Sequence, residues 1–326
     1  MSRSWLRELI RSLSERARSI RRRVTSGTTL NHRNTAIAAM IGSAACWGGG
    51  SVASKAALEH LDPVPLLVLQ LASSTAILWM AVFVTDGFIR SDRSARIAAL
   101  AGILEPGLSY TLGTWGLAFS SASVASTIGA TEPVIILLLA AVFLRERMAP
   151  RHILGAAGTV AGLFLIADPA RTSTVDIGGV LLVLGGTAAA AAYVLVSARF
   201  SHEVPPALGA ARQQTVGLAV VAGLLVAVVV NGDTPNWSDL NTEALILAFA
   251  SGAIQYALAF WLYLWGLKHL AASEAGLTLA LIPAFGILGG NVFLSERLQT
   301  VQLAGSALIV ATLILTLANP NTSTAG

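Results

Sequence analysis

The 326-residue chain has little charge and almost no cysteine. Only 12% of its residues are charged, about half the share in a typical soluble domain, whereas 55% are hydrophobic. The mean hydropathy is correspondingly high, at +0.71. The single cysteine, Cys46, excludes an intramolecular disulfide framework and a cysteine-based metal cluster. An ordinary soluble domain and a disulfide-bonded scaffold are therefore both excluded.

The chain also lacks the motifs of the common enzyme classes. It contains no phosphate-cradling glycine loop, no zinc-ligand spacing and no arrangement typical of a nucleophile triad. We therefore expect no cofactor, no metal and no enzymatic activity. The net charge of +4 reflects basic residues placed between apolar segments, so we expect no nucleic-acid binding either.

Long apolar runs are what the chain has instead. Residues 36–56, 64–84 and 207–230 each reach the roughly 20 residues that a membrane-spanning helix needs. Dividing the apolar stretches at their polar breaks predicts an all-α integral membrane protein with ten transmembrane helices. The predicted spans are 36–56, 64–84, 96–117, 120–143, 151–167, 178–200, 207–230, 244–267, 271–294 and 299–317.

Basic residues are distributed unevenly over the predicted loops. Lys and Arg in short loops collect on the cytoplasmic side of a membrane protein. With the N-terminus inside, 18 of the 21 Lys and Arg residues fall in cytoplasmic segments, and the remaining Lys55, Arg171 and Arg297 lie at or toward the outside. We therefore expect a multi-pass protein of the plasma membrane with both termini in the cytoplasm.

The second half of the chain repeats the first. The hexapeptide VFLRER, which begins at Val142, recurs 150 residues later as VFLSER at Val292. Further upstream the offset is nearer 144, which places Gln70 against Gln214. Each copy contains five predicted spans, and an odd number means that the second copy crosses the membrane in the opposite direction. Inverted repeats are characteristic of secondary transporters, whose substrate site lies near the midplane between the halves.

Two sets of motifs resemble a known family. The first set is SASVAS, TEPV and FLRER followed by HILGAAGTVAGLFLI, and the second is AASEAG, LIPAF, FLSER and QLAGSALIVATLIL. Together they resemble the drug/metabolite transporter superfamily, specifically its ten-span EamA-type members, over nearly everything from Ala36 to Ala318. Many relatives carry an arginine early in the second span, where this chain has Gln70.

The resemblance implies two five-helix inverted-topology repeats and a transport function. The implied units are a basic cytoplasmic tail at 1–35, repeats at 36–169 and 177–318, and a short tail at 319–326. Members of the superfamily move amino acids, other small metabolites, nucleotide sugars or drugs. Among bacterial EamA-type proteins, export of amino acids and related metabolites is the best-represented activity. The basic tail fits either an amphipathic helix on the membrane surface or a disordered segment that fixes orientation.

Two carboxylates lie within predicted spans. Ionisable groups at bilayer depth are costly, so each is a functional candidate by default. Glu105 and Glu132 fall near the middle of spans 96–117 and 120–143, and their repeat mates are Gln255 and Ile282. We expect them to bind the substrate or a proton. The alternative for Glu132 is a carboxyl hydrogen-bonded to backbone loosened by the neighbouring Pro133.

Prolines, aromatic rings and amides complete the candidate set. The repeat mates Pro133 and Pro283 lack an N–H and leave a carbonyl unbonded, so we expect a hinge or pathway lining, with a packing kink as the alternative. A ring beside a cation suits an amine substrate, although core or lipid-facing packing fits each ring singly. The candidate substrate-binding residues of this kind are Trp47, Tyr110, Tyr193, Gln214, Gln255, Tyr256 and Trp261.

The inverted repeat predicts a secondary transporter that works by alternating access, and the family resemblance implies that it exports small metabolites, amino acids or amines. The transport mode is left open between uniport and proton antiport. A carboxylate withdrawn from water can exchange a proton for a cationic amine, which fits the second mode. Two other readings remain: a flippase for lipids or lipid-linked sugars, and a membrane scaffold or sensor that transports nothing. The oligomeric state is not predicted.

Overall fold

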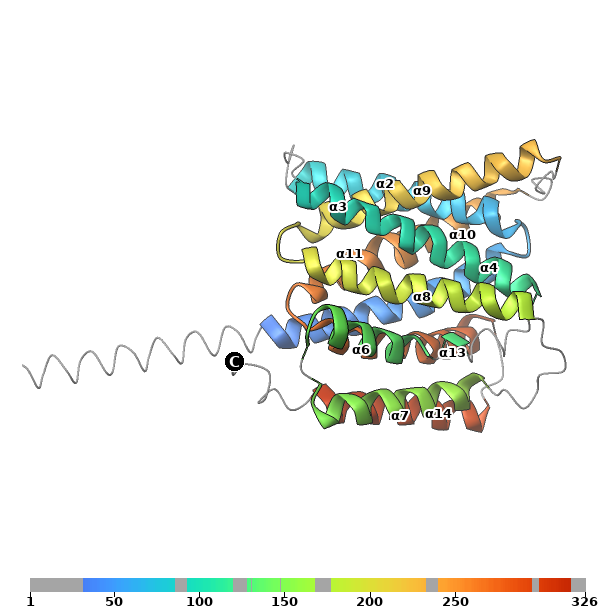
Figure 1. The fold of residues 1–326 in the computed structure, drawn as a ribbon. Helices are drawn as coiled ribbons and strands as arrows, with labels where there is room; N and C mark the ends of the chain where they lie inside the picture. Colours follow the sequence, from blue (N-terminus) through green and yellow to red (C-terminus); the bar gives the residue numbers. More distant parts are fainter. Residues whose placement is uncertain are drawn as a thin grey trace, which may run out of the picture.

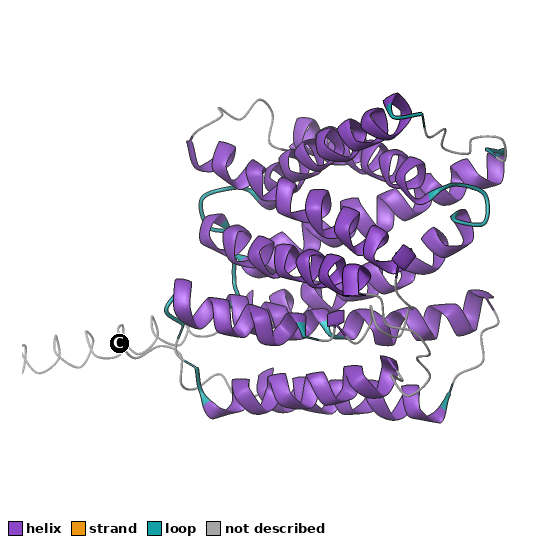
Figure 2. Ribbon diagram, turned by 45° about the vertical axis from the view of Figure 1, so that its right-hand side comes forward, coloured by secondary structure: helices purple, strands orange, loops and turns teal. Residues whose placement is uncertain are grey.

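The computed structural model describes residues 32–85, 93–119, 128–129, 131–146, 148–167, 177–232, 240–294 and 299–317, and every regular element in these ranges is a helix (Figure 2). The first helix spans His32–Ala57. The other elements are α2 (Pro63–Thr85), α3 (Arg93–Gly102), the π-helical turn η1 (Ile103–Leu108), α4 (Ser109–Phe119), α6 (Glu132–Phe143), α7 (Pro150–Ala167), α8 (Ile177–Phe200), α9 (Pro206–Val230), α10 (Thr242–Ser251), the π-helical turn η3 (Gly252–Leu258), α11 (Ala259–Leu267), α12 (Ala272–Leu279), α13 (Leu281–Leu294) and α14 (Thr300–Leu317). Residues 32–35 of the predicted N-terminal tail belong to the first helix. Residues 1–31, the predicted tail at 319–326 and the pair Glu296-Arg297 of the VFLSER copy lie outside the described residues.

The described helices account for the ten predicted membrane crossings. Seven of them are long and apolar enough to cross a membrane, and α12 and α13 together form one of these seven. The shorter apolar helices α6 and α7 and the continuous segment from α3 through η1 to α4 make three more. Local sequence explains several helix starts, because proline is favoured in the first turn and stands at the beginning of α2, α7 and α9. The prediction of an all-α membrane protein is confirmed.

The two repeats run in opposite directions. The first helix and α8, which open the two repeats, begin at opposite ends of the bundle (Figure 1). Arg33 Nη1, at the start of the first helix, donates a 3.0 Å hydrogen bond to the backbone oxygen of Leu317, at the end of α14. The described chain therefore begins and ends on the same side of the bundle, as an even number of crossings requires.

Repeat mates also pack against each other in layers. The helices α2 and α9 form one outer layer, α7 and α14 form the opposite one, and α8, α6 and α13 lie between them (Figure 1). Small residues bring α7 and α14 together. A Cβ added to Gly158 would lie 2.6 Å from Thr312 Oγ1, and a Cβ on Gly162 would lie 2.7 Å from the backbone oxygen of Gly305. Close approach at glycine is a common way of packing helices in membranes, where dispersion contacts replace the hydrophobic effect.

Both repeats contain a π-helical turn at the same place, since η1 and η3 are related by the 150-residue offset to within one residue. A glycine at the start of each turn packs on the opposite repeat. A Cβ on Gly102 would clash with the backbone oxygen of Gln213, and a Cβ on Gly252 would clash with the backbone oxygen of Gln70. The same close contact is therefore made twice.

This contact corrects the predicted match of Gln70 with Gln214. Gln70 Nε2 donates a 2.8 Å hydrogen bond to Ser54 Oγ, and Gln213 Nε2 donates a 3.3 Å hydrogen bond to Ser197 Oγ. Both pairs of counterparts are separated by 143 residues rather than 144. Adjacent glutamines are equivalent in a sequence match, but a helix points them about 100° apart, so only Gln213 repeats the contacts of Gln70.

Candidate functional site

A cavity of about 290 Å³ lies between helices of both repeats. It is bounded by the first helix, η1, α4, α6, α8, η3, α11, α12 and α13. The side chains of this central cavity range from two carboxylates to an aromatic wall and an aliphatic side. They are Trp47, Ser51, Glu105, Ser109, Tyr110, Glu132, Ala190, Tyr193, Val194, Gln255, Tyr263, Leu279 and Ile282.

The structure brings six of the nine predicted substrate or proton residues to this one cavity, namely Trp47, Glu105, Tyr110, Glu132, Tyr193 and Gln255. These residues come from five different predicted spans. Polar and aromatic side chains of distant segments therefore converge, as a substrate site at the interface of two repeats requires.

Repeat counterparts line the central cavity in pairs. Glu105 faces it with its counterpart Gln255, and Glu132 with its counterpart Ile282, both at the 150-residue offset. The first helix and α8 add two further pairs at the corrected offset of 143 residues, Trp47 with Ala190 and Ser51 with Val194. The cavity thus lies where the two repeats meet, and three of its four pairs combine a polar or aromatic residue of the first repeat with an aliphatic residue of the second.

Glu105 reaches the cavity from a local break in its helix. Its φ and ψ are −147° and 125°, whereas the flanking residues are helical, and its peptide bond to Pro106 is cis. A residue that precedes proline disfavours the helical conformation, so the sequence pair Glu-Pro explains the position of the break. Pro106 itself packs beside Gly217 of α9, where a Cβ would clash with the proline ring.

Glu132 reaches the cavity from the first residue of α6. The preceding turn is closed by Thr131 Oγ1, which donates a 2.6 Å hydrogen bond to the backbone oxygen of Ile128. Pro133 follows directly, in the first helical turn, where its missing N–H leaves no intrahelical bond unmade. The alternative for Glu132 was a hydrogen bond between its carboxyl group and the backbone beside Pro133. The described part of the chain contains no such hydrogen bond.

Neither carboxylate has a hydrogen-bond or ion-pair partner within the described residues. No Lys, Arg or His is among the described residues that line the central cavity. An ionised carboxylate withdrawn from water is strongly disfavoured unless a positive charge or hydrogen-bond donors accompany it. The cavity is therefore suited to receive a cation or protons.

The counterpart of Glu105, in contrast, is held by the protein. Ser54 Oγ donates a 2.7 Å hydrogen bond to Gln255 Oε1. Gln70 Nε2 donates 2.8 Å hydrogen bonds to Ser54 Oγ and to Ser251 Oγ, which fixes Ser54 in turn. Gln255 thus belongs to a satisfied network, whereas Glu105 at the equivalent position is free to meet a ligand.

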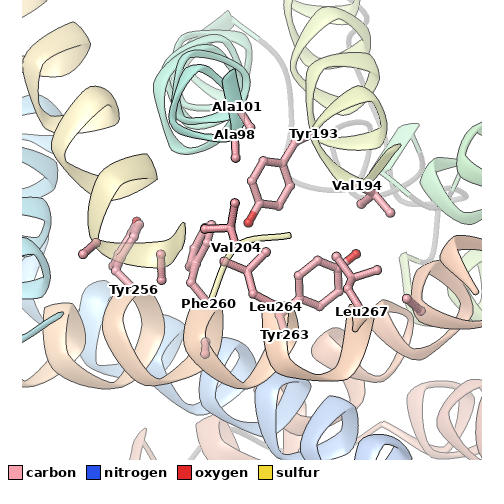
Figure 3. Close-up of a cluster of buried hydrophobic side chains, with 14 of the residues drawn as sticks. Ala98, Ala101, Tyr193, Val194, Val204, Tyr256, Phe260, Tyr263, Leu264 and Leu267 are labelled. Carbon is pink, nitrogen blue, oxygen red and sulfur yellow. The ribbon is translucent and has the colours of Figure 1, made fainter. Parts of the chain in front are cut away.

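Aromatic rings line one side of the cavity and belong to a larger buried cluster. Figure 3 labels Tyr193, Tyr256, Phe260 and Tyr263 of this cluster. Trp47 packs edge-on against Phe260 and Tyr263, with ring centroids 5.1 and 5.4 Å apart. Tyr193 stacks on Tyr263 at 6.4 Å and meets Phe260 edge-on at 5.8 Å. Such ring pairs contribute about 0.5–1.5 kcal/mol each beyond their buried area, so this wall is rigid.

Two polar atoms of this wall have no partner. Trp47 Nε1 and the Tyr263 hydroxyl are both buried without a hydrogen bond to any described residue. Tyr193 differs, because its hydroxyl donates a 3.1 Å hydrogen bond to Gln213 Oε1. An unmade hydrogen bond of a buried donor costs about 1–3 kcal/mol, so two such donors in one cavity wall mark a place where a ligand can bind.

Three predicted site residues lie outside the cavity lining. Tyr256 is buried behind Tyr110, with ring centroids 5.2 Å apart, and supports the wall from its far side. Gln214 is fully buried in α9. Trp261 is 43% exposed on the outer side of α11, so its assignment to the substrate site is not supported. Helical periodicity explains this, because Phe260, Tyr263, Leu264 and Leu267 occupy the inward face of that helix.

The two predicted hinge prolines meet at a second cavity of about 230 Å³, called the adjoining cavity here. It shares Glu132, Leu279 and Ile282 with the central cavity. Both prolines stand in the first turn of a helix that follows a break, rather than in the middle of a continuous helix. The rest of its lining is apolar and consists of Gly129, Pro133, Leu163, Ile166, Ala280 and Pro283.

A larger hollow of about 570 Å³ lies away from the two carboxylates and the aromatic wall. It runs between the first helix, α13 and α14, and most of its lining is aliphatic. Ile314 in its wall is 61% exposed and Val310 is 42% exposed, so the hollow opens on the outer surface of the bundle. It contains neither Glu105 nor Glu132.

Sequence reasoning missed several lining residues. Ser51, Ser109 and Tyr263 carry polar groups into the cavity but were not among the predicted site residues. Tyr263 could have been found, because it lies seven residues after Tyr256 and so returns to the same helical face. Aliphatic lining residues such as Val194 could not have been found, because in the sequence they look the same as residues of the hydrophobic core.

One contact between the repeats also escaped prediction in detail. Glu146, in the VFLRER hexapeptide, accepts hydrogen bonds from the backbone N–H groups of Ala272, at 2.9 Å, and Ser273, at 3.2 Å. Glu146 therefore caps α12 of the second repeat. The N-cap residue of that helix, Ala271, makes no side-chain capping hydrogen bond. Nearby, Glu274 forms a 2.8 Å ion pair with Arg33 of the first helix.

Comparisons with known proteins agree with this architecture. An uncharacterized transporter of Archaeoglobus fulgidus is 26% identical over 264 residues, which are 81% of this chain and 92% of the relative. The uncharacterized transporter YvbV of Bacillus subtilis is 25% identical over 272 residues, with 82% and 87% covered. The threonine/homoserine exporter RhtA of Escherichia coli is 28% identical over 153 residues, with 47% and 50% covered.

A solved crystal structure shares the fold, with a TM-score of 0.74 at 18% identity over 86% of this chain and 96% of the other. The model of the EamA-like transporter family matches residues 34–167 and 177–318. Two matches in one chain agree with the internal repeat, and the relatives that cover most of the chain are named as transporters. The chain is therefore a multi-pass membrane transporter and belongs to the EamA-like transporter family.

Proposed function

We propose that the protein exports small metabolites that carry an amino group, amino acids or amines, by alternating access of the central cavity. The observation that carries this proposal is the pair Glu105 and Glu132, which share a cavity between the repeats and have no partner among the described residues. A substrate ammonium supplies the missing positive charge, and hydrogen bonds to a charged group contribute about 1.5–3 kcal/mol. The name of RhtA, a threonine/homoserine exporter, supports a substrate of this kind.

Alternating access is supported by the paired architecture. The two repeats, proposed to extend over residues 36–169 and 177–318, would rock against each other around the cavity. Pro133 and Pro283 both line the adjoining cavity and stand in the first turn of helices that follow a break, which suits a hinge role. The distribution of basic residues supports a plasma-membrane location with both termini in the cytoplasm.

The energy source is either the substrate gradient or a proton gradient. In the antiport mode, Glu105 or Glu132 would bind a proton when the substrate leaves. In the uniport mode the same carboxylates bind the ammonium only. The two modes differ in whether an imposed pH gradient changes the initial rate of substrate movement.

The test is uptake into proteoliposomes of a labelled panel that contains amino acids and primary amines. Wild type and Glu105→Gln are compared with and without a pH gradient. We expect flux in wild type and at least a tenfold loss in the variant, since 1.4 kcal/mol corresponds to about a factor of 10. Absence of flux for every compound would refute the proposal and favour a lipid flippase or a scaffold.

A further inference from the structure

The charge of the central cavity discriminates among amino compounds. Its described lining contains two carboxylates and no cationic side chain. A zwitterionic amino acid would bring a third carboxylate into this cavity, where like charges repel strongly because little water screens them. An amine without a carboxylate brings only the positive charge that the cavity lacks.

The aromatic wall favours the same ligand. Trp47, Tyr193 and Tyr263 line the cavity and belong to one packed cluster of rings. A cation within about 6 Å of such rings is attracted by their quadrupoles, most strongly where water is excluded. The free Trp47 N–H and Tyr263 hydroxyl can donate hydrogen bonds to a hydroxyl or ether oxygen of the ligand.

The adjoining cavity offers room for an apolar group. It measures about 230 Å³, and Glu132 is its one ionisable lining residue among those described. An apolar cavity of about 150 Å³ binds benzene in another protein, so an aromatic ring with a short linker fits here. Glu132, Leu279 and Ile282 line both cavities, so the two are adjacent and these three side chains stand between them. A ligand that reaches both cavities must pass these side chains.

Given the proposed transport function, we infer that the substrate is a lipophilic amine with one positive charge and no carboxylate. Its ammonium binds in the central cavity beside Glu105, Glu132 and the aromatic wall. Its apolar group occupies the adjoining cavity between Pro133 and Pro283. This inference narrows the proposed substrates from amino acids or amines to amines alone.

The experiment is isothermal titration of the purified full-length protein with three compounds. The reference compound is 2-phenylethylamine. Phenylalanine has an additional carboxylate, and ethylamine lacks the phenyl group. We expect 2-phenylethylamine to bind at least tenfold more tightly than either, a difference of about 1.4 kcal/mol. Equal or tighter binding of phenylalanine would overturn the exclusion of the carboxylate, and equal binding of ethylamine would overturn the role of the adjoining cavity.

A substitution that fills the adjoining cavity tests the second half of the inference. Leu163→Trp should lower the affinity for 2-phenylethylamine about tenfold, toward that of ethylamine, and leave ethylamine binding unchanged. Ile166→Phe is the milder version on the same wall. Leu154→Trp is the matched control, because Leu154 lies on the same helix and is 71% exposed. Equal losses for both amines in the two filled variants would contradict the assignment.

Binding and flux separate the two proposals. Binding with the expected preference but no flux of any compound would overturn the transport function and leave the ligand class standing. Flux and binding of amino acids in preference to amines would overturn the ligand class and leave transport standing. The binding measurement does not depend on passive leakage of the neutral amine, because the titration uses no membrane barrier.

Discussion

The two repeats make the same contacts in their framework. Gly102 packs on the backbone of Gln213, and its counterpart Gly252 packs on the backbone of Gln70. The glutamines then hydrogen-bond to counterpart serines, at 2.8 Å in one repeat and 3.3 Å in the other. The close contacts of α7 with α14 likewise join one helix from each repeat. At the helix contacts, both repeats therefore use the same residue types and make the same interactions.

The cavity shows the opposite behaviour. Glu105 and Glu132 of the first repeat face Gln255 and Ile282 of the second, although the backbone positions are equivalent. A substrate without twofold symmetry presents different chemistry to the two sides, so lining residues are under different demands. We therefore propose that counterparts of the same residue type hold the bundle, while counterparts of different type serve the ligand. Four experiments on substituted proteins test this distinction.

The largest effect is expected from making the first pair symmetric. Glu105→Gln reproduces the amide of Gln255 and removes one of the two negative charges. Transport of an amine should fall tenfold to a hundredfold, because a hydrogen bond to a charged group contributes about 1.5–3 kcal/mol. Initial rates in proteoliposomes measure this. The matched control is Gln255→Asn, which keeps an amide, and an equal loss there would show that the two sides are equivalent after all.

A somewhat smaller effect is expected for the second pair. Glu132→Ile reproduces Ile282 and leaves Glu105 as the remaining carboxylate in the cavity lining. Transport of an amine should fall about tenfold, the effect of about 1.4 kcal/mol. The control is Ile282→Leu, which preserves volume and polarity. Unchanged transport in Glu132→Ile, measured as initial rate, would restrict the cation site to Glu105.

The framework pairs should respond alike. Gly102→Ala and Gly252→Ala each place a methyl group against the backbone of the opposite repeat, and overpacking of this kind costs about 1–3 kcal/mol. Both variants should therefore unfold at lower temperature in detergent, by similar amounts. Gly113→Ala is the control, because a Cβ there has no neighbour within 4 Å. A shift in only one of the two variants would break the symmetry of the framework.

The smallest effect concerns the cap of α12. Glu146→Ala removes the acceptor of the Ala272 and Ser273 N–H groups, and loss of a helix cap costs about 1 kcal/mol. The population of the conformation in which Glu146 caps α12 should fall about fivefold relative to the conformation of the transport cycle without this contact. Labelling of Ser51→Cys, in a Cys46→Ala background, with an impermeant thiol reagent from each side of oriented proteoliposomes measures the shift. Glu203→Ala is the control, and identical labelling of all variants would exclude a role for the cap.

Most of the fold could be predicted from the sequence. Apolar length gave the ten helices, and the recurrence of VFLRER as VFLSER gave the repeat, because bilayer thickness and gene duplication both leave linear traces. The two carboxylates were also found, since charge inside an apolar run is conspicuous. The register of Gln70 was wrong by one residue, because adjacent glutamines carry the same letter and only packing distinguishes them. Trp261 was misplaced because a ring on a membrane helix can face lipid or core.

The sequence by itself determined the membrane environment, the number of helices, the repeat and the position of Glu105 and Glu132 within their spans. Each of these depends on residues near one another in the chain, or on a pattern that recurs along it. The tertiary structure alone decided which side chains share the central cavity, that Gln255 is held by Ser54 while Glu105 is free, and that Tyr263 and Trp47 keep unpaired donors. These properties depend on distances between helices from different repeats, and the packing of small residues sets those distances.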